Sequence, residues 1–210
     1  MTRLNVYNLA YPVRSLGPGL RAVVWVAGCG RRCPGCISPE MQDPGAGRMI
    51  GTGTLARRVT GIGLPLTGLT VSGGEPLDQA RSLADFLHKI RRARPKWDVL
   101  IYSGYLLTEI EDRIPGGPEV LALADVLVDG PYVAEAPAVH PLAGSGNQEV
   151  HLLSPRAQAL ARDYGNPPPF PFELGLGPGN FALLVGVGRP DLRRRVHREL
   201  GLESQKEGRP

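Results

Sequence analysis

The sequence predicts an open α/β barrel with a mainly parallel sheet. Two observations carry this prediction: short apolar runs alternate with segments of helical periodicity, and glycine-containing motifs directly follow several of those runs. Strands that alternate with helices favour parallel pairing, because each crossover helix returns the chain to the same end of the sheet. Ligand sites in such folds gather at the carboxyl ends of the strands. We therefore expect the functional residues along that edge.

The strands and helices are predicted in chain order from their apolar patterns. Apolar and β-branched runs predict strands over residues 4–9, 22–27, 69–72, 98–103, 124–129 and 150–153. Apolar residues at helical spacing predict helices over residues 54–59, 78–93, 108–113, 119–123 and 155–164. Gly17-Pro18-Gly19 marks a turn between the first two strands, and a glycine-rich stretch over residues 44–53 precedes the first helix. From the second strand onward, strands and helices alternate as a parallel sheet requires.

The last part of the chain is predicted to be an extension rather than part of the barrel. Pro167-Pro168-Pro169 marks the boundary between a domain over residues 1–166 and an extension over residues 167–210. The extension is expected to hold a hairpin, a basic helix and a frayed end, over residues 172–176 with 181–187, 191–200, and 201–210.

Charge and hydropathy exclude some function classes. The formal net charge is +4 and the isoelectric point is about 9.2, but much of the excess lies in two helix-like runs, at residues 91–94 and 193–195. Such runs are typical of solvated helix faces, so no nucleic-acid partner is expected. No apolar stretch approaches the ~20 residues that span a bilayer. The N-terminus also lacks the apolar run of a signal peptide. We expect a cytoplasmic location without a membrane partner.

The cysteines indicate a metal cluster. All three lie in the segment Cys29-Gly30-Arg31-Arg32-Cys33-Pro34-Gly35-Cys36, which has the spacing CxxxCxxC. A loop with such short spacings can turn several thiolates toward one iron-sulfur centre. A 4Fe-4S cluster that only transfers electrons normally takes four protein thiolates, so three cysteines leave one iron open. An open position on a metal can bind a substrate or cosubstrate. We predict Cys29, Cys33 and Cys36 as the cluster ligands.

This loop resembles the signature of the radical S-adenosylmethionine superfamily. In that superfamily the open iron binds the amino and carboxylate groups of S-adenosylmethionine, whose reductive cleavage gives a 5′-deoxyadenosyl radical that takes a hydrogen atom from the substrate. A second motif, Gly73-Gly74-Glu75-Pro76, follows the next recognisable strand. Its glycines permit close backbone approach, and its carboxylate can bind an ammonium group. The resemblance implies that Gly73, Gly74, Glu75 and Pro76 hold the methionine amino group.

Within the superfamily the chain is similar to the anaerobic ribonucleoside-triphosphate reductase activating proteins over roughly its first three quarters. The segments that carry this similarity are residues 71–77, 102–105, 125–132 and 144–148, together with the Cys33-Pro34-Gly35-Cys36 step. The resemblance implies a 4Fe-4S cluster and S-adenosylmethionine as cofactors, a glycyl-radical enzyme as partner, and an electron donor such as flavodoxin or ferredoxin. Ser103 and Asp129 are further candidates for contact with S-adenosylmethionine.

Other interpretations remain open at this point. Ser103 suits an ordinary strand end, and Asp129 suits a turn cap as well as a ribose contact. A radical oxidoreductase that acts on a small molecule or a peptide would share the same motifs. A protein of another class, a non-catalytic metal scaffold, would use the cysteines in a zinc site completed by His88 or His140.

Overall fold

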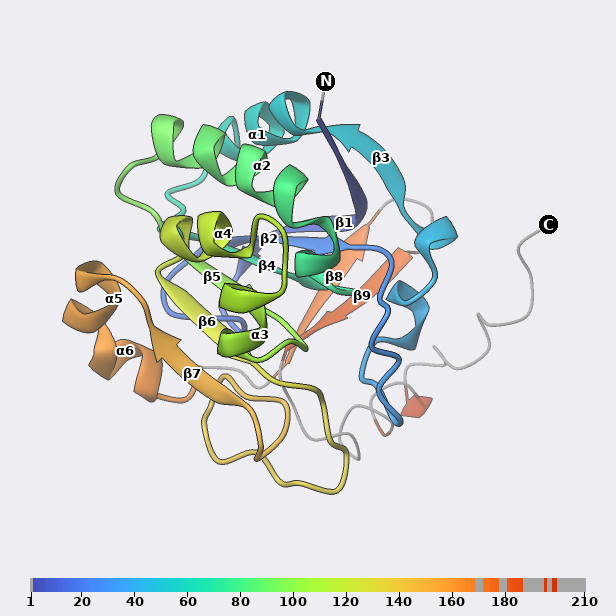
Figure 1. The fold of residues 1–210 in the computed structure, drawn as a ribbon. Helices are drawn as coiled ribbons and strands as arrows, with labels where there is room; N and C mark the ends of the chain where they lie inside the picture. The colour runs from blue at the N-terminus through green and yellow to red at the C-terminus, as the bar shows by residue number, and fades with distance from the viewer. Residues whose placement is uncertain (1, 169–171, 178–180, 187–194, 196–197, 200–210) are drawn as a thin grey trace.

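The computed structural model describes residues 2–168, 172–177, 181–186, 195 and 198–199, and it shows an open seven-stranded sheet (Figure 1). The strand order is β3-β1-β2-β4-β5-β6-β7. The strands are β1 (Arg3–Val13), β2 (Arg21–Val26), β3 (Arg48–Gly51), β4 (Gly68–Gly73), β5 (Asp98–Tyr102), β6 (Val126–Asp129) and β7 (Glu149–Leu152). The sheet is not closed, which confirms the predicted open α/β barrel.

The parallel part of the sheet is its centre. β2, β4, β5 and β6 pair in parallel, whereas β1, β3 and β7 pair antiparallel at the two sides. The sheet is therefore mixed, with the parallel strands that were predicted to carry the motifs at its middle. β3 was not predicted, because its four residues are only partly buried and the segment lacks an apolar pattern.

The helices between residues 52 and 123 cover one face of the sheet, and the two short helices after β7 pack on the other face (Figure 1). The α-helices are α1 (Thr52–Thr60), α2 (Ala80–Ala93), α3 (Leu107–Asp112), α4 (Gly117–Leu123), α5 (Pro155–Ala159) and α6 (Ala161–Gly165). Short 3-10 turns are η1 (Pro39–Met41), η2 (Pro44–Ala46) and η3 (Pro76–Gln79). The single helix predicted over residues 155–164 is two short helices that meet at Leu160. In the described part of the chain, no helix has the length and apolarity to cross a membrane.

The main core lies between the sheet and helices α1 to α4. Alternate residues of the central strands, such as Val24 and Val71, point to this side and are fully buried. α2 presents Leu83, Phe86 and Leu87 to them, because apolar residues recur on one face of this helix. Full burial of each such side chain contributes roughly 1.5–3 kcal/mol. This packing holds the central strands, and hence their carboxyl ends, in a common register.

The opposite, inner face of the sheet packs against α5 and α6 on the side of β5 and β6, and against a separate hairpin on the side of β2. The strands of this hairpin are β8 (Glu173–Gly177) and β9 (Phe181–Val185). Val185 packs in a cluster with Val23 and Trp25 of β2. The Glu173 carboxylate accepts hydrogen bonds from the backbone N–H groups of Arg14 and Ser15, both at 2.7 Å. The hairpin predicted for the extension is thus present, and it docks on the barrel. The division at residue 166 stays a prediction, and most of the basic helix predicted over residues 191–200 lies outside the described residues.

A buried ion pair anchors the amino ends of the strands. Arg21 is fully buried at the start of β2, and its Nη1 lies 2.7 Å from Oδ2 of Asp98 at the start of β5. Arg21 also donates to the Thr70 hydroxyl at 2.7 Å and to the Leu69 carbonyl at 2.8 Å. The Tyr164 hydroxyl donates to Asp98, which ties α6 to the sheet. Each buried charge therefore has several partners, as burial of an ion requires.

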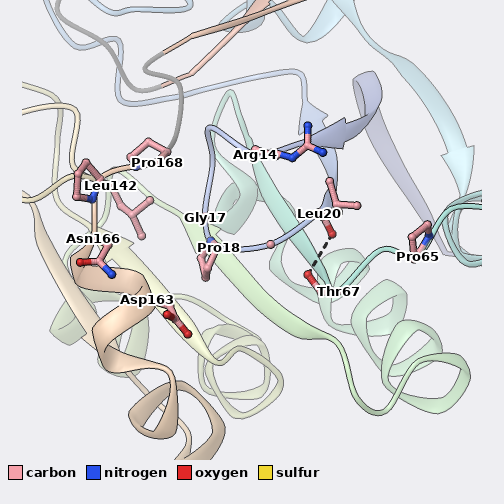
Figure 2. Close-up of a pocket in the computed structure, with 12 residues that line it drawn as sticks. Arg14, Gly17, Pro18, Leu20, Pro65, Thr67, Leu142, Asp163, Asn166 and Pro168 are labelled. Carbon is pink, nitrogen blue, oxygen red and sulfur yellow. Dashed lines mark hydrogen bonds between the residues drawn. The ribbon is translucent and has the colours of Figure 1, made fainter.

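A pocket of about 480 Å³ opens at this same amino end (Figure 2). It lies between the Gly17-Pro18-Gly19 turn, the start of β4 and the segment that follows α6. The Thr67 hydroxyl donates to the Leu20 carbonyl at 3.2 Å along its wall. The pocket is on the edge opposite to the cysteine motif, so it plays no part in the site described next.

Candidate active site

The chemical motifs meet at the carboxyl edge of the parallel strands. The cysteine loop follows β2, Gly73-Gly74-Glu75-Pro76 ends β4, Ser103 follows β5, and Asp129 ends β6. These four strands are neighbours in the sheet. The structure therefore places all the predicted site residues along one edge, as expected for ligand sites in sheets of this kind.

The cysteine loop is a tight, partly exposed turn. The N–H groups of Gly28 and Cys29 donate to the carbonyls of Met41 and Gln42 at 2.9 and 3.1 Å. Farther along, the Cys36 N–H donates to the Cys33 carbonyl at 3.2 Å. All three thiols are free and half-buried, at the rim of the fold. The loop thus offers three thiols on one preformed turn.

The backbone after the first cysteine turns two N–H groups toward its sulfur. Arg32 has φ +46°, an uncommon left-handed conformation for a residue with a side chain. The N–H groups of Arg32 and Arg31 hydrogen-bond to the Cys29 sulfur. Burial raises the pKa of the Cys29 thiol, and these N–H groups oppose that effect. Hydrogen bonds to a ligand sulfur also tune the potential of an iron-sulfur cluster.

The donor set fits a cluster better than a single ion. Among the described residues, no three His, Cys, Asp or Glu side chains converge on one metal position. A four-iron cluster does not need such convergence, because each thiolate binds a different iron. His88 pairs with Glu119 at 2.9 Å on the surface of α2, and the His140 ring accepts the Leu142 N–H at 3.1 Å. Neither histidine completes a zinc site with the cysteines.

The two glycines of the second motif let β4 pack directly on the cysteine loop. Gly73 has φ +111°, and a Cβ on Gly74 would lie 2.2 Å from the Gly28 carbonyl oxygen. The Gly74 N–H donates to Val26 and the Glu75 N–H donates to Gly28, both at 2.8 Å. The close approach that these glycines permit is therefore to the backbone that leads into the cysteines.

Glu75 is buried at the centre of the edge, with 1% of its surface exposed. Its Oε1 accepts the Leu77 N–H and the Ser103 hydroxyl, each at 2.9 Å, and its Oε2 accepts the Gly104 N–H at 2.7 Å. Burial raises the pKa of Glu75 to about 7, and the charge of Asp78 adds to this, while the three hydrogen bonds oppose it. A carboxylate has about four acceptor positions, so about one remains for a ligand.

A group that the sequence analysis missed ties the cysteine loop to the loop after β5. Asp78 accepts the Gly30 N–H at 3.0 Å through Oδ2 and the Tyr105 hydroxyl at 2.7 Å through Oδ1. The hydrogen bond to Asp78 is the main reason why the pKa of Tyr105 is raised to about 12. Arg31 stacks on the Tyr105 ring at 4.7 Å and lies 3.5 Å from Glu109. The sequence signal was an acidic residue three positions after Glu75, which suits a helix start equally well.

Asp129 is buried and already has partners. Its Oδ2 accepts the Leu107 N–H at 2.6 Å, at the start of α3, and its Oδ1 lies 3.2 Å from Nε2 of His151. This arrangement is that of a helix cap. Contact between Asp129 and S-adenosylmethionine stays a prediction. Asn147 and Gln148 donate to the backbone carbonyls of residues 131 and 130 at 2.7 and 2.9 Å, and so hold the loop after β6.

A second pocket of about 480 Å³ opens beside the cysteine loop. Cys29, Arg32 and Asp78 line it, together with the edge where β1 meets α2. Gln79 closes that side, because it accepts the Asn5 N–H at 2.7 Å and donates to the Ala27 carbonyl at 3.2 Å. One cysteine of the predicted cluster site therefore faces open space.

Comparison with known proteins identifies this edge. The profile of the 4Fe-4S single cluster domain family matches residues 15–151, a span that includes the cysteine loop, the Gly73–Pro76 motif and Asp129. The chain belongs to this family of radical S-adenosylmethionine enzymes. Like other radical S-adenosylmethionine enzymes, it uses a 4Fe-4S cluster and S-adenosylmethionine as cofactors.

Several curated relatives share most of their length with this radical S-adenosylmethionine enzyme. It is 30% identical over 155 residues to the anaerobic ribonucleoside-triphosphate reductase-activating protein of Escherichia coli K12, which covers 70% of this chain and 98% of the relative. It is 27% identical over 148 residues to the protein of the same name from Enterobacteria phage T4, covering 69% and 92%. A shorter match, 31% over 86 residues, is to the 7-carboxy-7-deazaguanine synthase of Methanothermobacter thermautotrophicus, covering 40% and 33%. The protein is thus an activase-like radical enzyme.

Proposed function

We propose that this radical S-adenosylmethionine enzyme activates a partner protein by forming a glycyl radical on it, and that the partner is an anaerobic ribonucleoside-triphosphate reductase. The observation that carries the proposal is the match to reductase-activating proteins over 98% of a relative's length. When bound, the cluster and cosubstrate supply the one-electron cleavage of the sulfonium and the 5′-deoxyadenosyl radical that takes a hydrogen atom from glycine. A flavodoxin or ferredoxin supplies the electron.

In this proposal Cys29, Cys33 and Cys36 hold the cluster. Their place on one turn, and the hydrogen bonds to the Cys29 sulfur, support the assignment. The half-buried position of the loop supports access for an electron donor.

The Gly73–Pro76 motif holds the amino group of the cosubstrate, with Glu75 as its carboxylate. The acceptor position left on Glu75 suits an N–H donor of that amino group, and Ser103 acts through Glu75 by keeping its carboxylate in place. Asp129 is proposed to reach the cosubstrate ribose through whatever acceptor capacity Leu107 and His151 leave.

The test is electron paramagnetic resonance of an anaerobic reductase after incubation with the reduced, reconstituted protein and S-adenosylmethionine. A glycyl radical that depends on all three components is the expected result. Cys33→Ala should abolish cluster retention and the radical, whereas Glu75→Ala should retain iron and weaken S-adenosylmethionine binding. Full iron content in Cys33→Ala would contradict the ligand assignment. A reductase that shows no glycyl-radical signal would contradict the activase assignment.

A second candidate function is that of a radical S-adenosylmethionine oxidoreductase that acts on a small molecule or a peptide. The match to a 7-carboxy-7-deazaguanine synthase favours it, although that match covers only 33% of the relative. The two functions differ in what 5′-deoxyadenosine formation depends on. Stimulation by a small molecule, without any effect of the reductase, would favour the second candidate.

A further inference from the structure

The Tyr102 hydroxyl is buried without a hydrogen-bond partner. Its oxygen is inaccessible to solvent, and none of the described residues donates to it or accepts from it. Buried hydroxyls in native proteins nearly always have a partner, because desolvation without one costs stability. An unpaired one at the end of β5, immediately before Ser103, requires an explanation.

In the described part of the chain, one other side-chain atom is buried without a hydrogen-bond partner, but acidic groups lie close to it. The second atom is Nε2 of His151. It lies 3.2 Å from Asp129 Oδ1 and 3.9 Å from Glu149 Oε2, so two acidic side chains face this ring nitrogen. The charge of Arg21 acts on Tyr102, but no hydrogen bond from Arg21 reaches the phenol oxygen. Burial raises the pKa of Tyr102, so the phenol stays protonated and can act as a donor.

Tyr102 lies on the inner face of the sheet, in the layer nearest the motif edge. Strand register aligns Trp25 of β2 with Ser72 of β4, and Tyr102 of β5 with Val128 of β6. The β4–β5 register, which pairs Val71 with Ile101, places Ser72 beside Tyr102 when it is continued by one residue. The Tyr102 ring packs against the clusters that contain Trp25 and Val128. A tyrosine with an unpaired hydroxyl thus lies on the strand end that leads into Ser103, and Ser72 lies beside it on the neighbouring strand.

We infer that Tyr102 is a substrate-binding residue whose hydroxyl donates a hydrogen bond to a backbone carbonyl of the glycine-containing peptide segment that is activated. This inference rests on the proposed activase function. A glycine has no side chain, so a site can hold it only through the backbone N–H and C=O groups around it. A phenol hydroxyl without a partner of its own, among the apolar side chains of these two clusters, suits that task. Val185, at the end of β9, packs in the same cluster as Tyr102. A peptide that reaches the Tyr102 hydroxyl therefore displaces the Val185 side chain.

The first part of the test is thermal unfolding of Tyr102→Phe beside the matched control Tyr164→Phe. Tyr164 is also buried on the inner face, but its hydroxyl donates to Asp98. Removal of an unpaired hydroxyl should leave the melting temperature unchanged or raise it, whereas Tyr164→Phe should lower it by about 2–4 °C or more. If Tyr102→Phe lowers the melting temperature as much as the control does, the hydroxyl is bonded within the fold and the inference is wrong.

The second part measures glycyl-radical formation against the concentration of the anaerobic reductase. The concentration for half-maximal rate should rise roughly three- to tenfold in Tyr102→Phe, more than the maximal rate changes, because one hydrogen bond to the bound peptide is lost. Tyr164→Phe should keep the wild-type value. An unchanged value in Tyr102→Phe overturns the inference. If the wild-type protein forms 5′-deoxyadenosine but no radical on the reductase, the activase function fails, and the assignment of a peptide to Tyr102 fails with it.

Discussion

The Ser103 hydroxyl donates a 2.9 Å hydrogen bond to Oε1 of Glu75, and this bond joins the end of β5 to the end of β4. Ser103 also accepts the Tyr105 N–H at 3.0 Å, so it orders the loop that carries Gly104. The buried Glu75 carboxylate is therefore held in place by a residue of the neighbouring strand. Its ionisation is the property that the next two predictions address.

Glu75 should make the protein less stable as the pH rises. Its folded pKa of about 7 is above the ordinary value of 4.5, so its contribution to stability is fully present below pH 4.5 and is lost as the pH rises through about 7. The loss is up to roughly 3 kcal/mol. In urea unfolding of cluster-free protein, Glu75→Gln should show a flatter pH dependence than wild type across this window. Parallel curves for the two proteins would contradict the raised pKa.

Ser103→Ala should move the ionisation of Glu75 to higher pH. The Ser103 hydroxyl is one of three hydrogen bonds that lower the pKa of Glu75, and its loss leaves burial less opposed. If the ionised carboxylate accepts a hydrogen bond from the amino group of the cosubstrate, S-adenosylmethionine affinity should fall severalfold at pH 7 and recover at pH 8.5 or so. Titration calorimetry at both pH values measures this. Ser103→Thr, which keeps the hydroxyl, is the control that should resemble wild type.

Gly74→Ala should disrupt the cysteine loop, because the new Cβ would lie 2.2 Å from the Gly28 carbonyl oxygen and 2.8 Å from that of Met41. Both are backbone atoms, which cannot rotate away. We expect a loss of roughly 3 kcal/mol or more in unfolding free energy, and poor iron incorporation on reconstitution. Gly63→Ala is the matched control, since a Cβ there meets nothing within 4 Å. Equal iron content in both variants would show that the contact is not needed.

Asp98→Ala should be strongly destabilising, because it leaves the fully buried Arg21 guanidinium without its charge partner. Loss of one member of a buried pair costs about 3–5 kcal/mol. Asp85→Ala, which removes the partly exposed partner of Lys89, should cost only about 0–1 kcal/mol. Urea unfolding of both variants gives the comparison. Similar losses for the two would mean that Arg21 finds another anion or water.

Glu173→Ala should loosen the hairpin β8–β9 without unfolding the barrel. The substitution removes the acceptor of the Arg14 and Ser15 N–H groups, whereas the buried Val185 side chain and the 3.3 Å hydrogen bond from the Ser15 hydroxyl to the Val185 carbonyl remain. Limited proteolysis should cut the segment after residue 166 faster than in wild type, while the melting temperature of the barrel changes little. Unchanged cleavage would show that the apolar contact is sufficient.

The edge that carries the site was predictable from the sequence because its signals are local. Apolar runs predicted β2, β4, β5 and β6, and the cysteine and Gly73–Pro76 motifs follow directly on two of them. In a parallel sheet that order alone brings the motifs to one edge. The strand β3 was not predicted, because its residues are exposed or only partly buried and it becomes a strand only through pairing with β1.

The contacts within the site were not predictable, because they join residues far apart in the chain. Asp78 meets Tyr105 across 27 positions, and Arg21 meets Asp98 across 77. In neither pair does the local sequence around one residue indicate which residue it contacts. Asp129 illustrates the same limit, since a strand-end carboxylate has the same local pattern whether it faces a cosubstrate or caps α3.

The Arg21–Asp98 pair and the cysteine loop occupy opposite ends of the same central strands. A substitution that changes the chemistry at the carboxyl end therefore leaves this ion pair intact. A substitution that breaks the ion pair at the amino end lowers the stability of the fold and does not alter its specificity. This separation lets the reactive loops diversify at low cost to folding. A scaffold of this size can therefore acquire a new substrate during evolution when the loops at the carboxyl ends of its strands change.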